Sequence, residues 1–102
     1  MELTVLERIV LLSALPNEGN FITLKIVRNL REELSFTEEE HKILNFKQLN
    51  DNISWDVKTN VIKDFKFGEK ATDIIKESLK KLNDSNKLTE QHYSIYLKFV
   101  GE

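Results

Sequence analysis

The sequence predicts a single α+β domain over residues 1–102, with three N-terminal helices, a small antiparallel β-meander and two C-terminal helices. Apolar residues recur at three- and four-residue intervals before residue 46 and after residue 68, which is the period of a helix. Between those points apolar and polar residues alternate, which is the period of a strand. The sequence contains no repeat, low-complexity segment or long linker, and its length suits one domain with a substantial core.

The first helix is expected over residues 3–15, where apolar side chains cover a broad face. Thr4 and Glu7 have the spacing of a capping box at its start. Pro16 ends the helix because a proline excludes the preceding residue from helical geometry. Leu11 widens the apolar face beyond the need of a one-sided surface helix. We therefore expect this helix either to be central in the fold or to contact a second chain.

The second and third helices are expected to meet in a helix-turn-helix-like corner within residues 21–44. Thr23 is the predicted N-cap of the second helix. Thr37 and Glu40 form a capping box for the third, whose first turn holds three glutamates that the helix dipole favours. The connection between the two helices is short. We therefore expect Phe36 to lie in the angle between them.

The meander is expected within residues 46–67, with turns at residues 50–52 and 58–60. Trp55 shares one face of its strand with two aliphatic residues. Lys63 interrupts the apolar face of the last strand, which indicates either an edge position or a side chain that lies flat on the sheet with its amine in water.

Two more helices follow the meander. The first is expected over residues 69–82, after Gly68. Thr89 is predicted to cap the second. Tyr93, Tyr96, Leu97 and Val100 form the predicted inner stripe of that last helix, with Ile95 and Phe99 beside it.

Composition excludes several classes of function. The formal charge is −2, so neither a polyanion nor an anionic membrane attracts the chain as a whole. The chain contains no cysteine, which excludes disulfides and thiolate chemistry. No stretch approaches the roughly 20 apolar residues of a membrane span, and the N-terminus lacks a signal-peptide pattern. We expect a cytoplasmic protein that does not interact with membranes.

No recognisable motif predicts catalysis. His41 and His92 each lie inside a predicted helix and outside any nucleophile or metal motif. Glu38 and His41 have the spacing of half a carboxylate di-metal site, but the second half is missing. The three glycines are scattered, so no phosphate-binding loop is present. The sequence therefore assigns no catalytic, cofactor-binding or metal residues, and we expect a non-enzyme without a cofactor.

Nucleic-acid binding is the alternative function. Three helices followed by a hairpin are similar to the order of a winged helix, in which the hairpin is the wing. In that fold the third helix enters the major groove, whereas here it reads TEEEHKILN and would present carboxylates to phosphate. The candidate contacts of this alternative lie on the second helix and the hairpin. They are Lys25, Arg28, Arg31, Lys63 and Lys66. The competing interpretation is that these residues are solvated charges interleaved with acids.

Protein binding is the preferred function. The first and last helices carry more apolar surface than packing on one side requires, and tryptophan and tyrosine are common interface anchors. Core packing is the competing explanation for the same residues. The candidate interface residues are Leu11, Trp55, Tyr93, Tyr96 and Phe99. We expect a regulatory or protein-binding domain with a protein partner of unknown identity, and self-association as a homodimer is compatible with the pattern. The composition would suit a small accessory protein of a bacterium or its phage.

Overall fold

The computed structural model describes residues 1–49, 52–55 and 61–101 of the chain. The described helices are α1 (Val5–Ala14), α2 (Phe21–Leu34), α3 (Glu38–Leu44), α4 (Glu69–Asp84) and α5 (Tyr93–Phe99), and a short 3₁₀ turn (Glu90–His92) precedes α5. The described strands are β1 (Glu2–Thr4), β2 (Lys47–Leu49), β3 (Asn52–Ser54) and β4 (Ile62–Asp64). The predicted α+β class is confirmed, and the order of helices and strands is roughly the predicted one.

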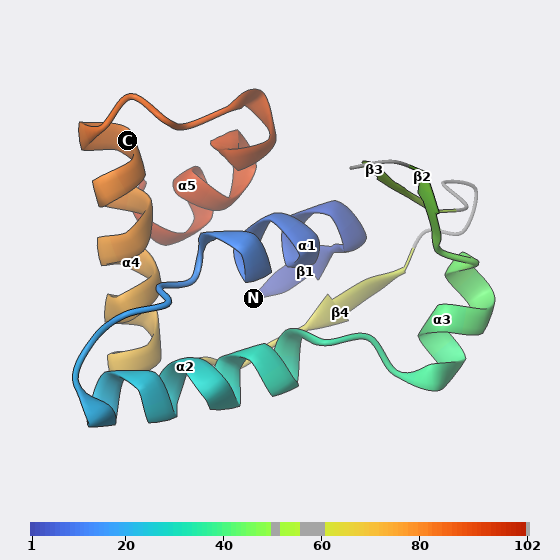
Figure 1. The fold of residues 1–102 in the computed structure, drawn as a ribbon, viewed down its shortest axis with the longest axis horizontal. Coiled ribbons are helices and arrows are strands. Elements are labelled where there is room, and N and C mark those ends of the chain that lie inside the picture. The colour runs from blue at the N-terminus through green and yellow to red at the C-terminus, as the bar shows by residue number, and fades with distance from the viewer. Residues whose placement is uncertain (50–51, 56–60, 102) are drawn as a thin grey trace.

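Helix α1 is central in the fold. It contacts α2, α4 and α5, which surround it in Figure 1. Val10 and Leu11 of this helix and Leu15 just after it belong to one core cluster, which also contains Leu30 of α2 and Ile75 of α4. Burial on several sides explains why this helix is apolar around most of its circumference.

Local signals set where the helices begin. The capping boxes predicted at Thr4 and Thr37 are confirmed, because each hydroxyl accepts from the backbone N–H three residues on. The predicted N-cap of α2 is wrong. Asn20, and not Thr23, caps this helix, since the Asn20 side chain accepts from the Thr23 N–H at 2.8 Å. Asparagine is at least as good an N-cap as threonine, so the helix begins three residues earlier.

The strands pair as two separate two-stranded antiparallel sheets. Strand β2 pairs with β3, and β4 pairs with β1 in the register Leu3 to Lys63. The last predicted strand therefore does not extend the hairpin as a third meander strand. It pairs instead with residues 2–4, so the prediction that the first helix begins at residue 3 is wrong. The turn predicted at 58–60 and most of the turn predicted at 50–52 lie outside the described residues.

Helix α4 matches its prediction closely, whereas α5 matches its prediction in part, because Tyr96 and Val100 of the predicted inner stripe pack against the core cluster. Ile95 and Phe99 of α5 are buried in the core cluster. Tyr93 and Leu97, which belong to the predicted inner stripe, are exposed instead. Both pairs are spaced by four residues, so periodicity alone could not decide which of them faces the core.

Helix α3 and the β2–β3 hairpin form an arm that stands apart from the rest of the molecule, which we call the body (Figure 1). In the described residues, the arm packs on the helices of the body much less than those helices pack on one another. Leu44 of the arm is fully buried but lies outside the main core cluster. None of the helices in the described part of the chain is long and apolar enough to span a membrane.

The capping of α2 gives a test of this fold. Asn20→Ala should lower the free energy of unfolding by about 1 kcal/mol, because it removes the side chain that accepts from the first turn. Thr23→Ala should change it by no more than about 0.5 kcal/mol, since alanine is a better helix former within the first turn. Urea unfolding of the two variants measures both values. Equal losses, or a larger loss for Thr23→Ala, would contradict the cap seen here.

Candidate protein-binding groove

Arg8 of α1 fixes the corner between α2 and α3. Its side chain is fully buried, and its Nε and Nη2 atoms donate to the carbonyl oxygens of Leu34 and Ser35 at 3.2 and 2.9 Å. Carbonyls at a helix C-terminus have no partner within the helix, and the helix dipole favours a cation there. The guanidinium also lies 3.9 Å from the centroid of the Phe36 ring, which is a cation–π distance. Arg8 therefore satisfies the end of α2 and packs on the residue that follows it.

Glu40 of α3 completes this corner. Its two carboxylate oxygens accept from Nη1 and Nη2 of Arg8 at 2.5 and 3.3 Å, and one of them also accepts from the Thr37 N–H at 3.0 Å. The hydrogen bond from Arg8 is the main cause that lowers the pKa of Glu40 to about 2, against the opposing effect of burial. The same carboxylate thus caps α3 and ties it to α1. The angle between α2 and α3 is set by Arg8 and Glu40.

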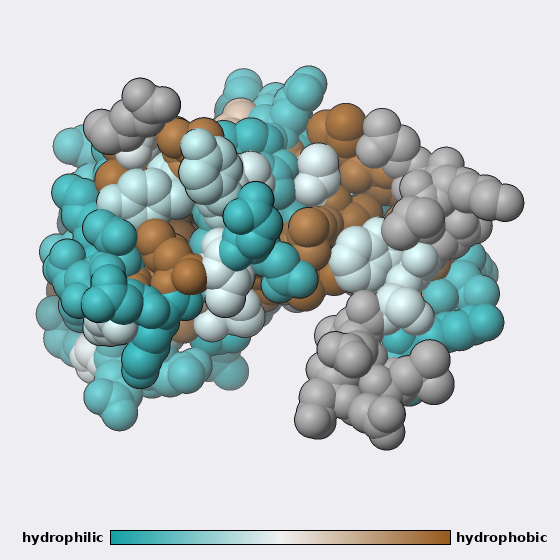
Figure 2. All heavy atoms as spheres, turned by 90° about the horizontal axis from the view of Figure 1, so that it is seen from above, coloured by the Kyte–Doolittle hydropathy of each residue, from teal (hydrophilic) through white to brown (hydrophobic). Residues whose placement is uncertain are grey.

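A groove lies between α1 and the arm that this corner positions. Ile9, Leu12 and Ser13 of α1 form one wall, and Phe36, His41 and Phe46 form the other, with Lys47 and Gln48 at the β2 end. Its volume is about 630 Å³, and its exposed lining is mostly apolar. Figure 2 shows apolar side chains gathered in the hollow between body and arm. This size and lining are typical of sites that bind a small molecule or the side chains of another protein.

Rings pack together along the arm side of the groove. The centroids of Phe36 and Phe46 are 4.9 Å apart, and His41 lies 5.3 Å from Phe46, all in edge-on arrangements. Trp55 of the hairpin joins them at 6.2 Å from Phe46. We call these four residues the aromatic cluster. Such ring pairs stabilise the arm beyond the burial of their area.

A second buried charge of α1 is Glu7, which precedes Arg8 in the helix. Glu7 accepts from Lys98 of α5 at 2.7 Å and from the Thr4 N–H at 3.0 Å. Burial alone would raise the pKa of Glu7, but the hydrogen bonds from Lys98 and Thr4 outweigh it and lower the pKa. Lys98 also donates to the Glu2 carbonyl oxygen at 2.8 Å, so this contact joins α5 to β1 and α1. The Glu7–Lys98 ion pair thus holds α5 against α1, as the Arg8–Glu40 pair holds α3 against α1.

The candidate interface residues predicted from the sequence lie in different places. Leu11 and Phe99 are buried in the core at 1% and 4% exposure, so their side chains offer no free surface. Tyr96 is half-buried against the core, and Tyr93 is 62% exposed on α5. Trp55 is half-buried in the aromatic cluster. Of these five residues, Trp55 is the one that the structure places beside the groove.

The predicted nucleic-acid contacts do not gather into one patch. Arg28 and Arg31 share a hollow with Pro16 and Asn17, and Arg31 donates to the Asn17 side chain at 3.1 Å. A different hollow is lined by Glu32, Glu33, Ser35, Thr37 and residues 63–66, which include Lys63 and Lys66. Lys25 is exposed on α2. Lys63 and Lys66 thus share their hollow with three carboxylates, those of Glu32, Glu33 and Asp64.

Neither histidine lies in a catalytic or metal-binding arrangement in the described residues. His41 lies within the aromatic cluster, and no carboxylate is among the described residues that line the groove. The Nδ1 atom of His92 accepts from the Thr89 N–H at 3.0 Å, which makes His92 a capping residue. No group of three or more histidine, aspartate or glutamate side chains gathers as a metal site within the described parts of the chain.

Sequence reasoning missed the groove because its walls come from separate segments. Phe36 was expected in the angle between α2 and α3, and it does contact Arg8 there. The contributions of Ile9, Leu12 and Phe46 were not predicted. One signal was available for Arg8, since an arginine within an otherwise apolar helix must have a buried partner if the helix is central.

Comparison of the chain with protein-family models, with curated proteins and with solved structures finds no match. The functional interpretation therefore rests on the geometry of the groove and on the charges around it.

Replacement of Arg8 tests the corner. Arg8→Met should lower the free energy of unfolding by about 3 kcal/mol, because it leaves Glu40 and two helix-end carbonyls without their partner. Arg28→Met, which removes an exposed arginine of α2, should change it by about 0.5 kcal/mol or less. Urea unfolding followed by circular dichroism measures both. A loss below about 1 kcal/mol for Arg8→Met would mean that other contacts hold the corner.

Acidification tests the ion pair in another way. Because the pKa of Glu40 is lowered to about 2 in the folded chain, its contribution to stability is complete above about pH 4.5 and is lost as the pH falls toward 2. A shift of this size corresponds to a loss of about 3 kcal/mol in the free energy of unfolding once Glu40 is protonated. Glu40→Gln should therefore flatten the acid limb of a stability–pH profile. Part of the slope should remain, since the pKa of Glu7 is lowered as well.

The matched control is Glu39→Gln, which removes a carboxylate from the same turn but leaves Arg8 paired. It should keep the acid limb of the wild-type chain. If Glu40→Gln and Glu39→Gln give the same profile, the Arg8–Glu40 pair does not control acid stability.

Proposed function

We propose that this chain is a non-enzymatic protein-binding domain, and that the groove between α1 and the arm is its binding surface. It acts stoichiometrically, by holding a segment of a protein partner. The observation that carries the proposal is the groove of about 630 Å³, whose exposed lining is mostly apolar and includes the rings of Phe36 and Phe46. Monomeric proteins seldom leave a concave surface of this kind without a ligand.

The residues around the groove favour a protein segment as its occupant. Phe36 and Phe46 are half-buried and present ring surfaces, while Ser13 and Gln48 offer hydrogen-bonding groups at the edge. Apolar anchors surrounded by a polar rim are typical of protein interfaces. The ring of Trp55 packs against that of Phe46, with the two centroids 6.2 Å apart. An apolar side chain of a partner would replace water over these rings.

The charges near the groove give less support to nucleic-acid binding. Lys47 is the one formally charged residue in the described lining, and the five basic candidates lie elsewhere. Glu38 and Glu39 are exposed on α3, the helix that a winged-helix protein would place in the major groove. Contacts to several phosphates need several cations on one face.

A groove variant tests the proposal. Ile9→Lys places a charge on the α1 wall at a half-buried position and should abolish retention of the partner when tagged protein is incubated with extract of its native host. Ile43→Lys is the matched control, because Ile43 is exposed on α3 and does not line the groove. Wild type and Ile43→Lys should retain the same partner. Retention that is equal in all three would remove the groove from the proposal.

Titration with duplex DNA distinguishes nucleic-acid binding, the alternative function, from protein binding. We expect no binding at low salt concentration. Binding with an affinity that falls steeply as salt is added would instead show that several phosphates are neutralised, and would favour nucleic acid as the partner.

A further inference from the structure

A second hollow, which we call the arginine hollow, lies between α2 and the link that follows α1. Its lining consists of Pro16, Asn17, Leu24, Val27, Arg28 and Arg31. The Asn17 side chain accepts from the Arg31 guanidinium at 3.1 Å, which holds that guanidinium at the hollow. The site thus combines two guanidinium groups with an apolar surround.

The arginine hollow and the groove are neighbours, because the chain passes from the wall of one directly to the lining of the other. Ser13 of the groove and Pro16 of the hollow are three residues apart, so their Cα atoms are separated by at most about 11 Å. On α2, Arg28 and Arg31 lie on one side of the helix, whereas Ile26 lines hollows that are shared with α4. An extended segment of about five residues, roughly 16 Å long, can therefore contact both the groove and the arginine hollow.

The groove and the arginine hollow also share a sign of charge. Within the described residues no carboxylate lines either of them, whereas Lys47, Arg28 and Arg31 do. Glu18 is exposed beside Asn17 and lies outside both linings. Three other hollows of the described structure mix the two signs: Glu33 with Lys66, Asp73 with Lys70, and Glu32, Glu33 and Asp64 with Lys63 and Lys66. Because the whole chain has a formal charge of −2, the basic linings are a local feature and do not follow from composition.

We infer that the partner segment held by the groove is acidic: an apolar side chain fills the groove, and a neighbouring carboxylate of the same segment binds in the arginine hollow. This inference rests on the proposed function and adds the chemistry of the partner. A guanidinium binds a carboxylate through paired hydrogen bonds, and two guanidinium groups on one side of a helix can converge on it. Lys47 would donate to a second carboxylate at the β2 end of the groove. Phosphates alone would leave the apolar lining of the groove without a partner.

Peptide probes of opposite charge test the inference. Two labelled peptides, Glu-Glu-Phe-Leu-Glu-Glu and Lys-Lys-Phe-Leu-Lys-Lys, share an apolar centre and differ in their flanks. In fluorescence anisotropy at low salt concentration the wild type should bind the glutamate probe about tenfold more tightly, although the net charge of the chain favours the lysine probe. The difference should shrink as salt is added. A wild type that binds the glutamate probe no more tightly than the lysine probe would overturn the inference.

Two further probes separate the apolar contact from the charges. Glu-Glu-Ser-Ser-Glu-Glu, which lacks the apolar centre, should bind about tenfold more weakly than the glutamate probe, because it leaves the groove unfilled. Equal binding of these two peptides would show that the charges act without the groove. A labelled oligothymidylate that binds more tightly than the glutamate probe would make single-stranded nucleic acid the occupant. Either result contradicts the inference.

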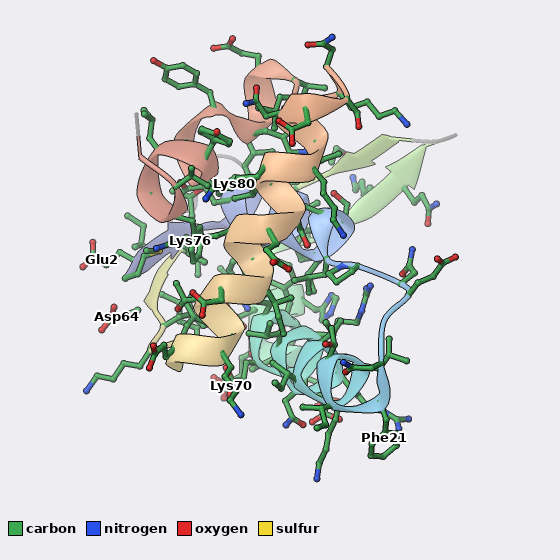
Figure 3. All side chains as sticks on the ribbon, turned by 90° about the vertical axis from the view of Figure 1, so that its left-hand side faces the viewer. Glu2, Phe21, Asp64, Lys70, Lys76 and Lys80 are labelled. Atoms are coloured by element: carbon green, nitrogen blue, oxygen red, sulfur yellow. The ribbon has the colours of Figure 1, made fainter. Side chains whose placement is uncertain are left out.

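A double variant locates the carboxylate contact. Arg28→Gln with Arg31→Gln should weaken binding of the glutamate probe about four- to twentyfold, which is two- to fivefold for each exposed ion pair. The matched control is Lys25→Gln with Lys80→Gln, which removes the same charge from outside the hollow. Lys25 is exposed on α2, and Lys80 lies on the half of α4 that is farther from α2 (Figure 3). The control should bind like the wild type, and circular dichroism checks that both double variants are folded. Equal weakening in the two would mean that net charge, and not the arginine hollow, attracts the probe.

The inference and the proposed function fail in different ways. A host partner that is lost in Ile9→Lys but retained in full by the Arg28→Gln, Arg31→Gln variant would keep the groove as a binding surface and refute the acidic segment. A host partner that wild type and Ile9→Lys retain equally would refute the proposed function itself.

Discussion

The guanidinium of Arg8 is the interaction on which the rest of the structure depends. It originates in the central helix and reaches the end of one neighbouring helix and the start of the next. The carbonyls at the end of α2 and the carboxylate at the start of α3 are groups that need a donor, and a buried arginine provides a planar set of donors that suits both. A lysine could not satisfy both sets in a fixed orientation. One side chain therefore sets the direction in which α3 leaves the body.

The direction of α3 in turn creates the groove. One wall belongs to α1, which is anchored in the core, and the other belongs to the arm, which has its own small packing around Leu44 and the aromatic cluster. The two walls share little apolar contact. The distance between the two walls is therefore set by the Arg8–Glu40 pair and not by core packing. For this reason the groove between them is not closed by apolar side chains.

Much of the fold could be predicted from local sequence signals, because those signals act within one or two helical turns. The capping boxes at Thr4 and Thr37 and the amphipathic pattern of α4 are of this kind. Strand β1 could not be predicted, since three residues carry no measurable period and they continue the apolar pattern of α1. Its partner β4 lies some sixty residues away, and the alternating pattern of β4 does not specify which strand it pairs with.

The candidate site was less predictable than the fold. Leu11 and Phe99 were chosen because they widen an apolar face, but that excess is buried where several helices meet. Trp55 was chosen for its residue type, and it does lie beside the groove. The walls of the groove depend on a contact between Arg8 and Glu40, 32 residues apart in the chain. No pattern of spacing along the sequence encodes such a contact.

The way in which the arm is attached has a consequence for the motions of the chain. Within the described residues the arm is held to α1 mainly by the Arg8–Glu40 pair, so it can open without disrupting the packing of α1, α4 and α5. Amide hydrogens of α3 and of the described hairpin would then exchange with solvent at a lower free-energy cost than those of α4. A ligand that contacts both walls of the groove would hold the arm against α1 and so slow this local exchange. Arg8 and Glu40 would then affect both the shape of the groove and the cooperativity of unfolding.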